Sequence, residues 1–344
     1  MSSIKNLNKL LLSDYLHANM KLPTGKIILR LSAVTHIKTS TVLILFFICL
    51  YSCKKDDSVD EVKTESFDKP ISAIAVSGEN VWIGTPANGL YKFDGEFWKE
   101  YTRTDGLLSD TITSLVVDEN EALWIGTNMG VSRFKDENWT NFTTQEGLFN
   151  NDIRSLTSDQ QNSIWIGTRN NRLIKYDGND FTSYHVNPEA SGQEEMGHIH
   201  TITCDLEGNV WAGSCISGLS KFDGINWEHY VNDLNLFVLS SICAVNGDVW
   251  IGHYTGAYRF SDEAWTHYTE TEGLINNQVT CFAVDRKNNI WIGTSQGLSM
   301  YDGSVWINYT VDDGLISNYI SALACDFDGN IWIGSAKGPM LMDQ

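Results

Sequence analysis

The stretch that decides the fold reads Ile320-Ser321-Ala322-Leu323-Ala324-Cys325-Asp326-Phe327-Asp328-Gly329-Asn330-Ile331-Trp332-Ile333-Gly334. Its first six residues form an apolar run that is typical of a β-strand. The Asp/Gly/Asn cluster that follows is a hairpin-turn signal. The last four residues then predict a second strand, antiparallel to the first. The stretch therefore predicts one β-hairpin that ends in Trp-Ile-Gly.

The Trp-Ile-Gly phrase recurs along the chain. It occurs seven times, with Ala in place of Ile in the fourth copy, at intervals of 42, 41, 46, 39, 41 and 41 residues, and begins at Trp82, Trp124, Trp165, Trp211, Trp250, Trp291 and Trp332. A period of about 40 residues with strand-like patterning is the signature of a β-propeller that has one blade per repeat. Each of the first six repeats holds four short β-rich runs separated by turn residues. We therefore predict an all-β, seven-bladed β-propeller of four-stranded antiparallel blades over residues 70–344.

The two ends of the repeat array suggest how the ring closes. The run 71–76 precedes the first Trp-Ile-Gly as an inner strand, whereas the seventh repeat stops after a third strand at 338–342. A ring needs closure because open strand edges pair with other chains. We predict that residues 59–67 supply the missing outer strand, within a tether over 53–69. The alternative is a three-stranded last blade and a disordered tether.

Residues 1–52 have the pattern of a leader. They hold six Lys/Arg and one acidic residue, and they include an apolar run of nine residues at 42–50. A bilayer span needs about 20 apolar residues, so the run suits the core of a secretory signal peptide. Ser52 before Cys53 resembles the lipobox of bacterial lipoproteins, and this resemblance implies that Cys53 is cleaved and lipidated. An ordinary signal peptide with an incidental cysteine is the alternative.

The charge of the chain limits its partners. The formal net charge is −19, and the leader is basic, so the excess of acidic residues lies in the remainder of the chain. Such a surface repels phosphate backbones, and we expect no nucleic-acid partner. We expect a monomer held at the membrane through its lipid anchor. The lipobox resemblance implies a bacterial envelope protein of the outer membrane, and residues 54–57 resemble a surface-export tag.

The repeat consensus points to a known family. Leu-Trp-Ile-Gly-Thr, Gly-Leu, Tyr-Asp-Gly and Asp-Gly-Leu recur with the order and spacing seen at residues 272–310. This pattern resembles the two-component regulator propeller repeat, over roughly residues 70–344. The resemblance implies an extracytoplasmic sensing domain, often one that responds to polysaccharides. Because no kinase sequence follows the seventh repeat, we expect the chain to act through a carbohydrate or protein partner.

Candidate binding residues lie where the repeat departs from its own pattern. The longest interval holds an enlarged loop, 185–197, that leads into His198 and His200, and strand alternation places both on one face. We predict a hairpin that pairs Cys204 with Trp211 and His200 with Cys215. Two imidazoles and a thiol could then bind a transition metal, or the histidines could contact a polar ligand.

Two further departures lie in turns after Trp-Ile-Gly. His253-Tyr254 replaces the usual Thr or Ser, and Arg169 begins a basic turn in an acidic protein. We take His198, His200, His253, Tyr254 and Arg169 as candidate ligand-binding residues, with ordinary loop variation as the alternative. The turn 326–330 has a weak likeness to a calcium loop, but similar turns recur in other repeats, which favours a hairpin.

These observations lead to one function and two alternatives. No Ser/His/Asp order, phosphate loop or paired-carboxylate motif stands out, so we assign no catalytic residue and no cofactor. We expect a lipid-anchored, extracytoplasmic propeller that binds a ligand or protein and senses or captures glycans. The first alternative is a metal-assisted lyase or hydrolase that uses His198, His200 or His253, as in the seven-bladed streptogramin lyases. The second is a structural interaction platform.

Overall fold

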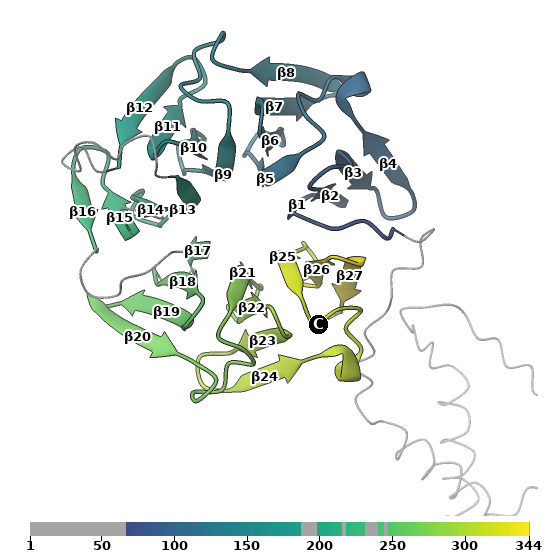
Figure 1. The fold of residues 1–344 in the computed structure, drawn as a ribbon, viewed down its shortest axis with the longest axis vertical. Helices are drawn as coiled ribbons and strands as arrows, with labels where there is room; N and C mark the ends of the chain where they lie inside the picture. Colours follow the sequence, from purple (N-terminus) through teal and green to yellow (C-terminus); the bar gives the residue numbers. More distant parts are fainter. Residues whose placement is uncertain (1–66, 187–197, 215–217, 231–239, 244–246, 344) are drawn as a thin grey trace, which may run out of the picture. The chain divides into compact units, whose positions relative to one another are not determined.

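The computed structural model describes residues 67–186, 198–214, 218–230, 240–243 and 247–343, and these form a ring of seven β-sheets (Figure 1). The first strand of each sheet lies nearest the axis of the ring and the last lies at the rim. All paired strands are antiparallel, and two short 3-10 turns, η1 (Arg103–Asp105) and η2 (Val311–Asp313), are the helical elements of the described residues. The predicted all-β, seven-bladed propeller is confirmed.

The blades follow one another along the chain, and the strands within each blade are ordered in sequence from the axis outward. Blades one to three consist of β1 (Ala73–Ser77), β2 (Asn80–Gly84), β3 (Leu90–Phe93), β4 (Trp98–Tyr101), β5 (Ile112–Val117), β6 (Leu123–Thr127), β7 (Gly130–Lys135), β8 (Asn138–Phe142), β9 (Ile153–Ser158), β10 (Ile164–Thr168), β11 (Arg172–Tyr176) and β12 (Phe181–His185). Blades four and five consist of β13 (Ile199–Cys204), β14 (Val210–Ser214), β15 (Gly218–Phe222), β16 (Trp227–His229), β17 (Ser240–Cys243), β18 (Val249–His253), β19 (Gly256–Ser261) and β20 (Ala264–Tyr268). Blades six and seven consist of β21 (Val279–Val284), β22 (Ile290–Thr294), β23 (Leu298–Tyr301), β24 (Trp306–Tyr309), β25 (Ile320–Cys325), β26 (Ile331–Ser335) and β27 (Gly338–Met342).

The tryptophans of Trp-Ile-Gly are structural. All seven are at most 6% exposed, and five of them donate from the indole Nε1 to an aspartate six residues earlier, at 2.8–3.3 Å. We call each such pair a Trp–Asp latch; the aspartates are Asp118, Asp159, Asp205, Asp285 and Asp326. Asp326 also accepts from the backbone N–H of Asp328 and Asn330, at 3.0 and 2.8 Å. The turn 326–330 therefore acts as a hairpin turn that supports its tryptophan.

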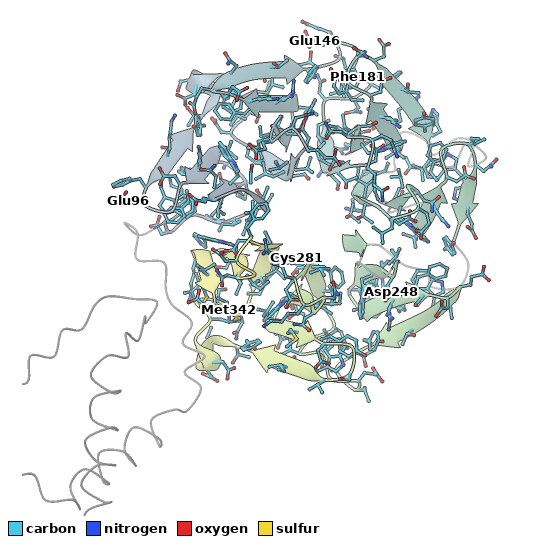
Figure 2. All side chains as sticks on the ribbon, turned by 180° about the vertical axis from the view of Figure 1, so that it is seen from behind. Glu96, Glu146, Phe181, Asp248, Cys281 and Met342 are labelled. Carbon is cyan, nitrogen blue, oxygen red and sulfur yellow. The ribbon has the colours of Figure 1, made fainter. Side chains whose placement is uncertain are left out.

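Aromatic side chains join each blade to its neighbour. The aromatic residues before the Asp-Gly-type turns pack on the tryptophan of the preceding blade, with ring centroids 5.5–6.1 Å apart, as in the pairs Phe93–Trp332, Tyr176–Trp124, Phe222–Trp165 and Tyr301–Trp250. Figure 2 shows side chains packed around the whole ring, with Glu96 and Glu146 at its rim and Cys281 nearer the axis. The glycine of Trp-Ile-Gly allows this packing, because a Cβ at Gly126 would lie 2.9 Å from Cγ2 of Ile153 in the next blade.

The ring closes between the first and last blades. The backbone N–H of Ile71 donates to the carbonyl of Ser335 at 3.1 Å. Ile71, Ile83 and Phe93 form one buried cluster with Trp332 of blade seven. The first blade is thus packed against the last through a hydrophobic seam, as expected for a closed ring.

Phe67 lies where the outer strand of blade seven would end. A Cβ on Gly338 would meet the carbonyl oxygen of Phe67, just as one on Gly297 would meet that of Tyr309, the last residue of β24. The ring of Phe67 also packs on Tyr91 and Trp98 of blade one, with centroids 4.8 and 4.9 Å apart. The described residues give blade seven three strands, and residues 59–66 of the predicted closing strand lie outside them. The closing strand therefore stays a prediction.

The leader predictions lie outside the described residues. These are the signal peptide over 1–52, the lipidation of Cys53 and the export tag at 54–57. Within the part of the chain that the structure describes, no helix is long and apolar enough to cross a membrane.

Candidate functional site

The two faces of the ring have different connections. We call connection face the side where the outer strand of one blade leads to the inner strand of the next and where the second strand turns into the third. We call hairpin face the opposite side, where the inner strand turns into the second. Because each inner strand runs from the connection face to the hairpin face, residues at the start of every inner strand share the connection face.

A β-bulge lies at the start of the inner strand in five of the described blades. The register with the second strand shifts by one residue there, and the bulged residues are Thr113, Arg154, His200, Thr280 and Ser321. Bulges re-aim a side chain and recur next to active and binding sites. Three of the five carry a small hydroxyl, and that of Thr280 donates to the carbonyl of Ile320 in the next blade at 2.6 Å. Arg154 and His200, in adjacent blades, are the exceptions.

Arg154 is held by Asp152, two residues earlier in the chain. Its Nε and Nη2 lie 3.1 and 3.2 Å from the two carboxylate oxygens of Asp152. Arg169, in the turn between β10 and β11, donates its backbone N–H to the carbonyl of Asp152 at 3.0 Å, and its Nη1 lies 3.5 Å from the carboxylate. One aspartate thus faces two guanidinium groups.

The two histidines of blade four join this group. Arg169 forms an isolated antiparallel bridge with His198, across the boundary between blades three and four. The ring centroids of His198 and His200 lie 4.4 Å apart in an edge-to-face arrangement. This confirms that both side chains lie on one side of their strand. We call Asp152, Arg154, Arg169, His198 and His200 the cationic cluster.

The cluster keeps its imidazoles neutral near neutral pH. Burial lowers the pKa of His198, and the charges of Arg154 and Arg169 lower it further, while Asp152 acts in the opposite direction. Burial also lowers the pKa of His200, followed by the effects of His198 and Arg154. The cluster therefore has one more positive than negative charge at pH 7, and it gains up to two more when the imidazoles are protonated.

The predicted pairing of the β13–β14 hairpin is wrong by one residue. Cys204 pairs with Val210 instead of Trp211, because the turn is centred on Glu207, where Asp205 accepts from the backbone N–H of Asn209 at 2.7 Å. The bulge then removes His200 from the pairing. Cys215 lies outside the described residues, among which no three His, Cys, Asp or Glu side chains are grouped to hold a metal ion.

The other two candidates lie in blade five. His253 is 2% exposed, and its Nδ1 lies 2.7 Å from the hydroxyl of Thr255. Its Nε2 has no hydrogen-bond partner in the described ranges. Burial, followed by the charge of His267, lowers the pKa of His253 to about 4. Tyr254 is 52% exposed on the connection face, so in this pair the tyrosine is the residue that a ligand can reach.

Sequence reasoning found three members of the cationic cluster and missed Arg154 and Asp152. A signal for Arg154 was present, because aligning the repeats on Trp-Ile-Gly places it at the position of Thr113 and Thr280. Asp152 carries no such signal. The importance of both follows from a contact between two blades, which periodicity within one repeat does not reveal.

Comparison with known proteins agrees with this architecture. The two-component regulator propeller family matches the chain at residues 106–129, 147–170, 273–296 and 314–337. No curated protein matches the sequence. Among solved structures, the extracellular domain assigned to the hybrid two component system BT3049 from B. thetaiotaomicron has a TM-score of 0.68 at 22% identity, over 80% of this chain and 39% of that one.

Two further structures show the range of proteins with this fold. The corresponding domain of BT4673, from the same organism, has a TM-score of 0.67 at 22% identity, over 83% of this chain and 39% of that one. An inactive virginiamycin B lyase from Staphylococcus aureus, solved with quinupristin, has a TM-score of 0.68 at 14% identity, over 83% of this chain and 98% of that one. The present chain thus spans about two fifths of the extracellular domains, and these identities establish a common fold. The chain is a seven-bladed β-propeller, and four stretches of it match the two-component regulator propeller repeat.

Proposed function

We propose that this protein is an extracytoplasmic ligand-binding propeller that senses or captures a saccharide on its connection face, with the cationic cluster at the centre of the site. The observation that carries the proposal is the pair Arg154 and His200. They take the bulge positions that hold Thr or Ser in blades two, six and seven. The extracellular domains that share the fold support an extracytoplasmic location. Anchoring through Cys53 is part of the same proposal.

The fold itself does not require these two side chains. The bulge forms equally with Thr113, Thr280 or Ser321, so its backbone geometry is independent of Arg or His. Burying an imidazole next to guanidinium groups disfavours its charged form, which is an electrostatic cost to a folded protein. Clusters with perturbed pKa values are concentrated at functional sites. A binding role explains why blades three and four depart from the common pattern.

Aromatic side chains on the same face fit a saccharide. Phe149, Tyr254 and Tyr319 are 50%, 52% and 50% exposed, and each lies in a connection or turn of the connection face. An exposed aromatic ring provides a flat apolar surface, and a tyrosine adds a hydroxyl group for hydrogen bonding. These properties suit sugar rings, which have one apolar face and a polar edge.

A paired thermal-shift and calorimetric titration tests the proposal. Wild-type protein and the double variant Arg154→Thr/His200→Thr are screened against neutral, amino and acidic oligosaccharides; the variant installs the residue found at the bulge of Thr113 and Thr280. We expect a saturable stabilisation of the wild type, about 2.7 kcal/mol at a ligand concentration of 100 Kd. We expect no such effect in the variant, with equal melting temperatures for both free proteins. Equal stabilisation of both proteins, or of neither by any saccharide, contradicts the proposal.

The same samples test the lyase alternative. The described residues bring two imidazoles together beside two guanidinium groups, whose charge opposes a cation at that point. We expect saccharides to be recovered intact after incubation with and without divalent metals. Product formation that depends on a metal and is lost in His198→Gln would assign the site to catalysis.

A further inference from the structure

We propose that the cationic cluster recognises the carboxylate of a uronic-acid saccharide, and that binding strengthens as the pH falls. The inference rests on the proposed function and deepens it, because it names the ligand class and the group that is recognised. It follows from the charge of the cluster, from the freedom of its guanidinium groups, and from the protonation of its histidines.

The local charge contrasts with that of the whole protein. The chain carries a formal net charge of −19, yet Asp152 is the one acidic residue among the five members of the cluster, against Arg154 and Arg169. A neutral sugar gains little from an excess guanidinium group. A carboxylate gains charge-assisted hydrogen bonds, which are roughly twice as strong as neutral ones.

Arg169 is free to turn toward a ligand. Its side chain is 60% exposed, and its Nη1 lies 3.5 Å from Asp152, which is long for a charge-assisted hydrogen bond. Arg154 is tied more closely to Asp152 and is 37% exposed, but a guanidinium has five N–H donors and two of its nitrogens face the aspartate. The planar fork of arginine matches a carboxylate in a bidentate pair. Arg154 thus offers a guanidinium held in place by Asp152, and Arg169 offers one that can turn toward the ligand.

The histidines make binding depend on pH. His198 faces Arg154, Arg169 and Asp152, and His200 faces His198 and Arg154. Burial, followed by the neighbouring positive charges, holds the pKa of each histidine below the ordinary value of 6.5. A bound carboxylate adds a negative charge beside the rings and raises these pKa values again. Binding therefore takes up protons and becomes stronger from pH 7 to pH 5, where a sugar carboxylate is still ionised at a pKa of about 3.5.

An exposed aromatic ring in the connection that leads into blade three favours a sugar acid over an acidic peptide. Phe149 lies in the connection that leads into blade three, and the guanidinium of Arg172, the first residue of β11 after the turn that holds Arg169, lies 6.0 Å from the centre of its ring. The exposed ring thus lies next to the blade that supplies Asp152, Arg154 and Arg169. Such a surface can stack on the sugar ring whose carboxylate reaches the cluster.

Calorimetric titration of matched ligands tests the inference. The ligands are oligogalacturonate and alginate oligosaccharides, the methyl ester of oligogalacturonate, and oligo-aspartate as an acidic peptide, each at pH 7 and pH 5 and at constant ionic strength. We expect the acidic sugars to bind at least about tenfold more tightly than the ester at pH 7. We also expect their affinity to rise by about tenfold at pH 5, because a charged hydrogen bond contributes about 1.5–3 kcal/mol.

Single variants separate the contributions. We expect Arg154→Gln to weaken binding of the acidic sugars by about 10- to 100-fold. We expect His200→Gln to weaken binding at pH 7 less than Arg154→Gln does, and to reduce the rise in affinity between pH 7 and pH 5. Arg286→Gln removes a positive charge from the hairpin face, between β21 and β22. This variant should bind the acidic sugars as tightly as the wild type at both pH values.

Each contrary result has a distinct meaning. If the methyl ester binds as tightly as the acid, the carboxylate inference fails while the proposed function stands. If oligo-aspartate binds more tightly than either sugar acid, the ligand class is wrong. If Arg286→Gln weakens binding as much as Arg154→Gln does, the site is wrong. If no saccharide binds at either pH, the inference and the proposed function both fail.

Discussion

The two ends of the inner strands differ in how strictly the repeat is kept. At the hairpin face, five blades use the same Trp–Asp latch with donor–acceptor distances of 2.8–3.3 Å. At the connection face, five blades share one bulge but place Thr, Arg, His, Thr and Ser on it. Repetition therefore marks the face that stabilises the ring, and departure from repetition marks the face available for binding.

The latch aspartates and the bulged residues differ in the interactions that each position must satisfy. A buried aspartate in a hairpin turn accepts several hydrogen bonds at once, so few other residues can replace it. A bulge re-aims the side chain of its extra residue, and the same bulge forms here with Thr, Ser, Arg or His, so the chemistry of this residue can vary. The same ring can then carry different ligands by changing a few bulge and turn residues.

The largest expected effect comes from breaking a latch. In blade three, Asp159 accepts from the backbone N–H groups of Gln161 and Ser163 and from Nε1 of Trp165, at 2.8–3.0 Å. Asp159→Ala leaves these donors without the carboxylate, and we expect a loss of about 2–4 kcal/mol in the free energy of unfolding, measured by urea denaturation. Asp177→Ala, in an exposed turn of the same blade, is the control, and it should lower the free energy of unfolding much less. If both variants lost the same free energy of unfolding, the latch aspartate would be no different from an ordinary turn residue.

A smaller effect is expected where the ring closes. Phe67 packs on Tyr91 and Trp98, across the seam between blades seven and one. Phe67→Ala should lower the free energy of unfolding by about 1.5–3 kcal/mol, because the side chain is partly buried and its loss leaves a gap in the seam. Phe97→Ala, at a residue that is 66% exposed in blade one, should leave the melting temperature almost unchanged. Closure by the N-terminal segment would be contradicted by a Phe67→Ala protein that melts like the wild type.

The smallest stability effect depends on pH. His253 has a folded-state pKa of about 4 against an ordinary value of 6.5, so the unfolded chain binds more protons between these values. Stability is therefore unaffected by this group above pH 6.5 and falls as the pH drops from 6.5 toward 4, by about 1–2 kcal/mol at pH 5. His253→Thr installs the residue found at Thr127 and should reduce that loss, as measured by urea unfolding at pH 7 and pH 5. Identical pH dependence in both proteins would show that His253 is not buried in its neutral form.

Sequence patterns predicted the scaffold well because its signals are local. The predicted strand at 338–342 coincides with β27, and the predicted inner strand at 320–325 coincides with β25. Hairpin residues and alternation act over a few positions, so each repeat specifies its own blade. The same reasoning placed Cys204 one residue out of register, because it did not foresee how Asp205 shapes the turn.

The candidate site was predicted only in part. The break in the repeat pointed to His198 and His200, and the basic turn pointed to Arg169. The proposed role of Arg154 follows from its proximity to His198 in the next blade. This proximity depends on how the blades pack and on a bulge that shifts the register. Contacts between repeats are long-range in sequence, and periodicity within a repeat carries no information about them.

A crystal structure of the protein with an oligogalacturonate at pH 5 would test most directly whether the departures from the repeat form the binding site. We expect a sugar carboxylate within hydrogen-bond distance of Arg154, His200 or Arg169, with the Trp–Asp latches unchanged on the opposite face. A saccharide ordered on the hairpin face, or bound on the connection face away from blades three and four, would contradict this assignment.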